Sequence, residues 1–271
     1  MIFYALAAGG LPISTLFLAG YVPGVLLGLS LMVICWLMAR RHGHPVGQRY
    51  TLREGLRVAA DASVGLFTIV IIIGGILTGV FTATEAAAVA VAYALFVALF
   101  VYRSLDRPAI GRIFATTLTT LAIVTAIIMT SSVFGFLLSY LRVPALLAEG
   151  IFAISENKAF VLLSINILLL ILGMLMDMGI LILILTPILL PIVTKVGVDP
   201  IQFGIILMMN LGLGLCTPPV GACLFIGCVI GKIKIEQAVK TIWPFYLAIL
   251  VALALVTYVP AISLTLPGLL E

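Results

Sequence analysis

The sequence has few charged residues and few histidines, and both shortages exclude classes of protein. Only 9% of the 271 residues are charged, whereas 64% are hydrophobic. Soluble domains carry about 25% charged residues, so the composition excludes a water-soluble fold and predicts an all-α polytopic membrane protein. The two histidines, His42 and His44, share one arginine-rich loop that has no acidic or cysteine neighbours. We therefore expect no metal site there.

Motifs for catalysis or nucleotide binding are also missing. The sequence contains no HExxH, GxSxG or Walker A pattern and no nucleic-acid signature. An intramembrane aspartyl protease would need a second deep carboxylate beside Asp177, and none is present. The four cysteines form no CxxC pair and lie in apolar segments, which favours buried structural thiols. We expect neither an enzyme nor a resident cofactor.

Long apolar segments occupy most of the chain and give its expected membrane spans. Besides an interrupted central region, we predict spans over about 13–38, 64–81, 85–102, 113–141 and 241–266. We expect the second and third to form an antiparallel pair, with Thr84 capping the third and Glu85 in its first turn. Two short basic stretches, Arg49–Asp61 and Lys232–Lys240, are predicted as amphipathic segments at the membrane surface.

The distribution of lysine and arginine orients these segments. Three stretches (residues 40–57, 103–112 and 232–240) carry 11 of the 14 basic residues, and the predicted spans place all three on one side. The positive-inside rule makes that side cytoplasmic.

Asp177 is the only charged residue in a run of 36 residues, 159–194. As one helix this run would be about 54 Å long, well beyond the roughly 30 Å of bilayer hydrocarbon. Split at its two glycines, it gives two arms of about 21–23 Å, each too short to cross. We therefore predict a re-entrant hairpin over residues 159–195 with Asp177 at its tip. A charge at that depth is costly and typically marks an ion or substrate path.

A second interruption follows in the uncharged stretch Pro200–Gly231. Its centre holds two prolines and three glycines, which cannot continue a regular helix. We predict two half-helices that meet at an unwound centre, with Thr217 capping the second and Pro218 or Pro219 at its first position. Half-helix N-termini suit an anion, and exposed carbonyls suit sodium. Asp177 would neutralise a cation or bond its own backbone.

Each candidate also has a purely structural interpretation. Prolines and glycines in membrane helices often only kink them, and Glu85 is expected at a helix start rather than at a ligand. Ser131 and Ser132 either line the site or bond back to their own helix. Arg142 either receives an anionic substrate or extends to the membrane interface.

Several segments resemble the large permease subunit of TRAP transporters (tripartite ATP-independent periplasmic transporters). Residues 79–90 resemble the turn before a scaffold helix, although Ala83 stands where proline is commoner. The other matching segments are Phe17–Gly24, Leu172–Asp177 with Ile184–Pro191, which resembles the family's second hairpin, and Asn210–Gly221, which resembles its second broken helix.

The resemblance implies a sodium-driven elevator built from two inverted halves, each with a hairpin and a broken helix. It implies an inner-membrane symporter for an organic acid such as a C4-dicarboxylate or a sialic acid. A periplasmic binding protein would deliver the substrate, and a small membrane subunit would brace the scaffold. Residues 1–112 would then be scaffold-type spans with the cytoplasmic amphipathic helix, 113–231 half of the transport domain, and 232–271 an amphipathic connector with the last span.

The resemblance also implies the site residues. The sodium and substrate site would be framed by Gly173, Asp177, Gly214, Thr217, Pro218, Pro219, Val220 and Gly221. Weaker candidates are Ser131, Ser132, Arg142 and Asn210. The chain has one hairpin and one broken helix, so we expect it to be the C-terminal portion of such a subunit. The alternatives are another elevator carrier without a binding protein, such as a sodium:dicarboxylate or citrate symporter or an ion antiporter, and a non-transporting membrane scaffold.

Overall fold

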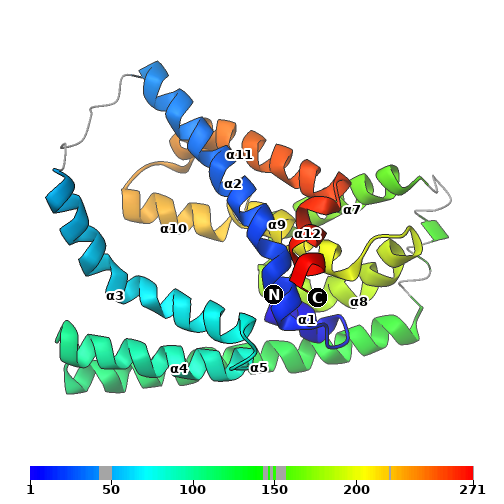
Figure 1. Cartoon of the computed structure of the whole chain (residues 1–271). Coiled ribbons are helices and arrows are strands. Elements are labelled where there is room, and N and C mark those ends of the chain that lie inside the picture. The colour runs from blue at the N-terminus through cyan, green and yellow to red at the C-terminus, as the bar shows by residue number, and fades with distance from the viewer. Residues whose placement is uncertain (43–50, 143–145, 147–148, 151–156, 220, 271) are drawn as a thin grey trace. The chain divides into compact units, whose positions relative to one another are not determined.

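The computed structural model describes all residues except 43–50, 143–145, 147–148, 151–156, 220 and 271, and the regular secondary structure of this part is entirely helical (Figure 1). This confirms the predicted all-α class. The helices are α1 (Ile2–Ala7), α2 (Ile13–His42), α3 (Leu52–Leu77), α4 (Ala83–Phe96), the π-helix η1 (Val97–Val101), α5 (Arg107–Tyr140), α7 (Lys158–Leu175), α8 (Met178–Lys195), α9 (Pro200–Leu215), α10 (Ala222–Gly231), α11 (Ile235–Tyr258) and α12 (Ala261–Leu270).

Among the described residues, five helices are long and apolar enough to cross a membrane, and a sixth joins them if a bent pair counts as one span. The five are Ile13–Arg41, Thr84–Val101, Lys158–Leu175, Met178–Lys195 and Ile235–Tyr258. The chain divides into two compact units, one of Met1–Gly43 with Ala126–Glu271 and one of His44–Thr125. The functional division into scaffold and transport parts stays a prediction.

The smaller unit contains the predicted antiparallel pair, α3 and α4. The Tyr93 hydroxyl donates to the Val64 carbonyl at 2.9 Å, and the rings of Phe67 and Tyr93 lie 5.6 Å apart. α3 is one helix with a bend of 48° between Arg53–Ala60 and Ala62–Ile76. The predicted amphipathic segment and the first member of the pair are therefore two legs of the same helix.

The N-cap of α4 is Thr82, so the prediction of Thr84 is wrong by two residues. A capping box decides the position. The Thr82 hydroxyl accepts from the Glu85 backbone N–H at 3.3 Å, while a carboxylate oxygen of Glu85 accepts from the Thr82 N–H at 2.8 Å. The prediction that Glu85 is a helix-start carboxylate is confirmed.

The core of the larger unit lies between α7, α8 and α9. α7 and α9 run parallel, since Lys158 lies beside Gly197 and Asn166 beside Asn210. The apolar side chains between them are almost wholly buried, as in Leu169 of α7 and Leu211 of α9, whereas Ile167 and Ile171 of α7 are exposed. These buried side chains are closely packed, and this packing holds the two helices against each other.

Near their C-terminal ends, α7 and α9 touch backbone to backbone. A Cβ placed on Gly214 would lie 2.5 Å from the carbonyl carbon and 2.7 Å from the Cα of Gly173. A Cβ on Gly173 would lie 3.2 Å from a methyl group of Leu211. We call this contact the Gly173–Gly214 crossing. Small residues at such points let membrane helices approach closely enough to gain full van der Waals contact.

Polar side chains join α7, α9 and α11 on another side of the core. The Asn210 amide donates to the side-chain oxygen of Asn166 at 2.8 Å, and the Asn166 amide donates to the Thr257 hydroxyl at 3.3 Å. The Gln202 amide donates to the carbonyls of Val256 and Thr257 at 3.2 and 3.1 Å. Asn210, Gln202 and Thr257 are almost wholly buried, so these hydrogen bonds offset the cost of burying their polar groups.

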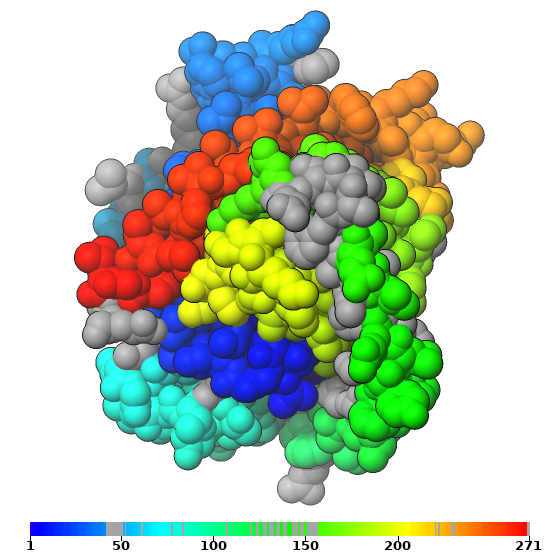
Figure 2. Space-filling model, turned by 90° about the vertical axis from the view of Figure 1, so that its right-hand side faces the viewer, coloured from blue at the N-terminus to red at the C-terminus, as the bar shows by residue number. Residues whose placement is uncertain are grey.

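The short N-terminal helix α1 was not predicted. Its Tyr4 is buried, and the hydroxyl donates to the Pro200 carbonyl at the start of α9. Figure 2 shows the blue N-terminal residues beside the yellow segment around residue 200. Burial, reinforced by the nearby charge of Asp199, raises the pKa of Tyr4, so this phenol stays protonated and able to donate.

The C-terminal region differs from the prediction. The basic stretch and the last span form a single helix, α11, which ends at Tyr258 rather than near residue 266. A separate helix, α12, follows and packs against α2 and α9. Pro260 stands at the junction, where the missing N–H favours a helix end.

The Gly173–Gly214 crossing gives a first prediction. Gly214→Ala should lower the free energy of unfolding by about 1–3 kcal/mol, because the added methyl group meets backbone that cannot move cheaply. The matched control is Gly212→Ala on the same helix, where a Cβ meets nothing within 4 Å. It should leave stability unchanged or raise it by about 0.5–1 kcal/mol. Thermal unfolding of the purified chain in detergent measures both, and equal melting temperatures would contradict the crossing.

Candidate functional site

The predicted hairpin is present as α7 and α8, joined at Met176 and Asp177. Its arms are longer than predicted, 18 residues each, or about 27 Å. The helices do not break at the glycines, because Gly173 lies inside α7 and Gly179 inside the first turn of α8. The expectation that each arm is too short to cross is therefore wrong, since both arms are among the helices long and apolar enough to span a membrane. The hairpin's re-entrant course through the membrane stays a prediction.

Asp177 is the N-cap of α8. One oxygen, Oδ1, accepts a hydrogen bond from the Gly179 backbone N–H at 2.8 Å. The carboxylate is exposed on this chain, and its second oxygen has no hydrogen-bond partner among the described residues. The sequence left two roles open for Asp177. The structure provides the backbone bond and leaves one oxygen available to a cation.

The predicted broken helix is confirmed. α9 ends at Leu215 and α10 begins at Ala222, and we call the connection Cys216–Gly221 the break. The predicted cap is wrong, since α10 begins at Ala222, five residues after Thr217, and the Thr217 hydroxyl instead donates back to the Leu213 carbonyl of α9. A threonine hydroxyl bonds back in this way when a carbonyl one turn earlier is in reach.

The remaining residues of the break are tightly constrained. Pro218 and Pro219 lie within the break rather than at the start of α10, and the peptide bond between them is cis. Gly221 has a φ of 33°, and a Cβ there would lie 2.8 Å from the Thr217 carbonyl oxygen. A side chain at this position would have a strained backbone conformation and would also clash with the Thr217 carbonyl oxygen. Val220, the remaining predicted residue, lies outside the described residues.

Sequence reasoning missed one residue that holds the break. Tyr246, in the middle of α11, is buried, and its hydroxyl donates to the Cys216 carbonyl. This bond satisfies a carbonyl that the end of α9 leaves without a helical partner. The sequence offered only a weak signal, because Tyr246 is one of two tyrosines in an otherwise largely apolar span.

The geometry brings the hairpin tip and the break to the same end of the core. α7 and α9 run parallel, so their C-terminal ends lie together beyond the Gly173–Gly214 crossing. Asp177 follows Gly173 by four residues, and Thr217 follows Gly214 by three. Helix C-termini carry partial negative charge. Two such ends beside a carboxylate form an environment that favours a cation.

The weaker candidates are not brought together with these residues. Ser131 and Ser132 lie in α5, and their side chains are outside the part that the structure describes. Arg142 follows α5, is exposed and has a φ of 55°, with no described contact to Asp177 or Thr217. Asn210 lies one turn before Gly214, with its amide bonded to Asn166. Membership of all these residues in the site stays a prediction.

Asn166 was also missed, although it is one of the few amides in the apolar segments. It lines a cavity of about 140 Å³ between α7, α9 and α11, together with Asn210 and Thr257. The Asn210 side-chain oxygen has no partner among the described residues. The cysteine prediction holds only in part, since Cys228 is buried and Cys216 half-buried, whereas Cys35 and Cys223 are exposed.

Comparison with known proteins finds similar sequences over almost the whole chain. Residues 1–262 match the family model described as "Tripartite ATP-independent periplasmic transporter, DctM component". An uncharacterized protein of Salmonella typhimurium, YgiK, is 46% identical over 269 residues, which cover 99% of this chain and 62% of that protein. The C4-dicarboxylate TRAP transporter large permease protein DctM of Rhodobacter capsulatus is 38% identical over 283 residues, covering 100% of this chain and 64% of the relative.

A third relative has a different named substrate. The sialic acid TRAP transporter large permease protein SiaM of Vibrio cholerae is 38% identical over 257 residues, covering 95% of this chain and 60% of SiaM. The chain thus spans somewhat less than two thirds of the length of these curated relatives.

The N-cap role of Asp177 gives a second prediction. Asp177→Ala removes the bond to the Gly179 N–H and should lower stability by about 1 kcal/mol. Asp177→Asn keeps an oxygen that caps equally well, so its stability should stay within a few tenths of a kcal/mol of the parent. Thermal unfolding in sodium-free buffer measures both. A loss in Asp177→Asn as large as that in Asp177→Ala would contradict the capping role.

Proposed function

The chain belongs to the DctM component family of tripartite ATP-independent periplasmic transporters, and from this premise we propose that it is the permease part of a sodium-coupled symporter for an organic acid. The family consists of transporter permeases rather than enzymes, and the chain is a multi-pass protein of the bacterial inner membrane. Coupling to sodium, the substrate class and the partners are parts of the proposal.

One observation carries the proposal, namely the convergence of two helix C-termini beside a carboxylate. The ends of α7 and α9 are held together by the Gly173–Gly214 crossing, and Asp177 and Thr217 lie just beyond it. Sodium prefers oxygen ligands, which unwound backbone and half-helix C-termini supply in membrane carriers. In the proposed site, Asp177 supplies the charge, while the backbone at Gly173 and Gly214 and the break supply the shape.

The proposed substrate and partners come from the relatives. Two of them are named as permeases for C4-dicarboxylate and for sialic acid, and both substrates are organic acids. An organic-acid anion would lie near the bound cation, which offsets its charge. The proposed partners are a periplasmic binding protein that delivers the substrate and a small membrane subunit.

A sodium-dependent melting temperature tests the proposal. The purified chain is unfolded in detergent with sodium chloride or potassium chloride at equal ionic strength. A site that binds only the folded state stabilises it by about 2.7 kcal/mol when sodium is about 100 times its dissociation constant. We expect a rise specific to sodium that is lost in Asp177→Asn, because this variant keeps the cap but lacks the charge.

The chain offers a matched control for this experiment. Asp199 caps α9 with the same geometry, its Oδ1 accepting from the Ile201 N–H at 2.7 Å. Asp199→Asn should keep the full sodium response. A chain that melts equally in both salts, or a response that Asp177→Asn retains, would sink the proposed sodium site and favour a non-transporting scaffold.

A further inference from the structure

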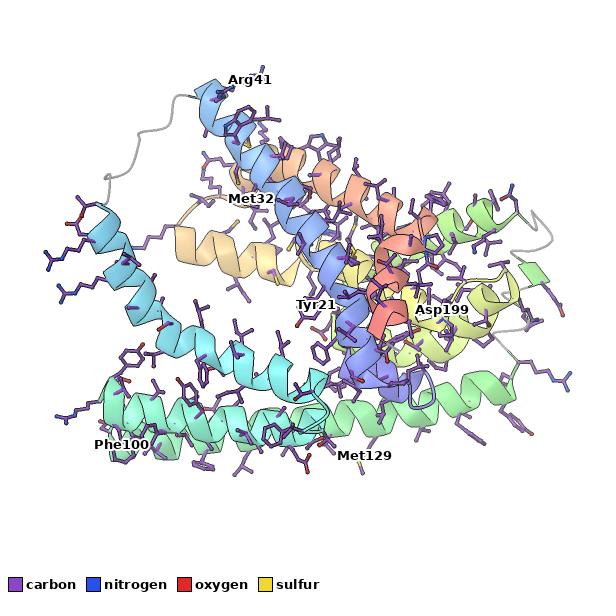
Figure 3. All side chains as sticks on the ribbon, viewed as in Figure 1. Tyr21, Met32, Arg41, Phe100, Met129 and Asp199 are labelled. Carbon is purple, nitrogen blue, oxygen red and sulfur yellow. The ribbon has the colours of Figure 1, made fainter. Side chains whose placement is uncertain are left out.

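A basic pocket lies between α2 and α11, and no residue of the hairpin tip or of the break lines it. Both helices belong to the larger unit, and they pack against each other. The pocket has a volume of about 390 Å³. Figure 3 shows Arg41, one of the lining residues, at the C-terminal end of α2. The lining residues are Ile34, Leu37, Met38, Arg41, Lys240, Thr241 and Pro244.

The charges of this pocket are of one sign. Arg41 and Lys240 are both exposed, and neither forms an ion pair within the described part of the chain. Glu236 lies one turn before Lys240 on α11 but does not come within ion-pair distance of it. Thr241 donates its hydroxyl proton to the Gln237 carbonyl at 3.1 Å. The pocket therefore offers a ligand two cationic donors.

The rest of the pocket lining is largely apolar. Leu37 and Ile34 lie one and two turns before Arg41 along α2, and Pro244 lies one turn after Lys240 along α11. A small hydrated anion would lose part of its hydration against these apolar side chains and gain no hydrogen bond from them. A molecule with a phosphate and an attached hydrocarbon chain matches both parts of the lining, because the phosphate can bind the two cations and the hydrocarbon can contact the apolar side chains.

The two tryptophans of the chain indicate the depth of this pocket. Trp36 precedes Arg41 by five residues, and Trp243 follows Lys240 by three. Both indoles are largely exposed, at 54% and 62%. Exposed tryptophans in membrane proteins concentrate at the level of the lipid headgroups. The guanidinium of Arg40 lies 4.2 Å from the centre of the Trp36 ring, a cation–π contact that leaves Arg41 as the cation of α2 in the pocket.

We propose that this pocket binds the headgroup of an anionic phospholipid. The phosphate lies between Arg41 and Lys240, and the upper part of the acyl chains lies along Ile34, Leu37 and Pro244. Basic pockets between membrane helices hold anionic headgroups by this combination of charge and apolar contact. The bound lipid joins the end of α2 to the start of α11.

Lipid retention tests the proposal. The purified chain in detergent is mixed with phosphatidylglycerol or with phosphatidylcholine of the same acyl chains, and bound lipid is measured by native mass spectrometry. We expect selective retention of phosphatidylglycerol. Each cation contributes about a five-fold change in affinity, so Arg41→Gln with Lys240→Gln should weaken binding about twenty-five-fold.

Three controls test whether the two cations of the pocket hold the lipid. Lys195→Gln removes an exposed cation from the end of α8 and should leave retention unchanged. Arg41→Lys with Lys240→Arg keeps both charges and should retain the lipid. Inorganic phosphate at the same concentration should not displace it. Melting temperatures in lipid-free detergent verify that each variant is folded.

Three results would overturn the proposal. The first is equal retention of phosphatidylglycerol and phosphatidylcholine. The second is unchanged retention in the folded double glutamine variant. The third is displacement by inorganic phosphate alone, which would assign the pocket to a free anion. The sodium response is measured separately and does not depend on any of these outcomes.

Discussion

The close contact of α7 and α9 at Gly173 and Gly214 is the constraint on which the candidate site depends. Two helices that touch backbone to backbone have no side chain between them to adjust, so their separation at this point cannot decrease. Because the two helices are parallel, this contact also fixes the positions of their C-terminal ends relative to each other. The carboxylate of the hairpin and the unwound segment after α9 are thereby held at one end of the core.

Hydrogen bonds to α11 hold the same arrangement from a second side. The hydroxyl of Tyr246 reaches the end of α9, while Gln202 reaches the carbonyls of Val256 and Thr257 farther along α11. In hydrocarbon these polar groups have no water as an alternative partner. A movement of α9 away from α11 would expose them, so α7, α9 and α11 are expected to move as one block.

The sequence predicted what local composition determines. Hydropathy located the spans, and the adjacent Pro218 and Pro219 located the break, because two successive residues without a backbone N–H interrupt the hydrogen bonds of a helix. Features set by tertiary contacts were missed or misplaced. The choice of Thr82 over Thr84 rests on a reciprocal bond with Glu85, and α1 depends on a pocket for Tyr4 that exists only once α9 has folded. Asn166 and Tyr246 were missed because their roles depend on hydrogen-bond partners that are distant in the sequence, Asn210 and the Cys216 carbonyl.

The pairing of Asn166 with Asn210 has a consequence for biosynthesis. The two amides are separated by 44 residues along the chain, so α7 leaves the ribosome and enters the bilayer well before its partner. Until then Asn166 has only its own helix, through the Leu162 carbonyl at 3.0 Å, to accept its N–H groups. The amide oxygen stays unsatisfied in the lipid during that interval. Arrival of α9 ends this penalty, so membrane assembly of this region is completed only when translation has passed the second amide.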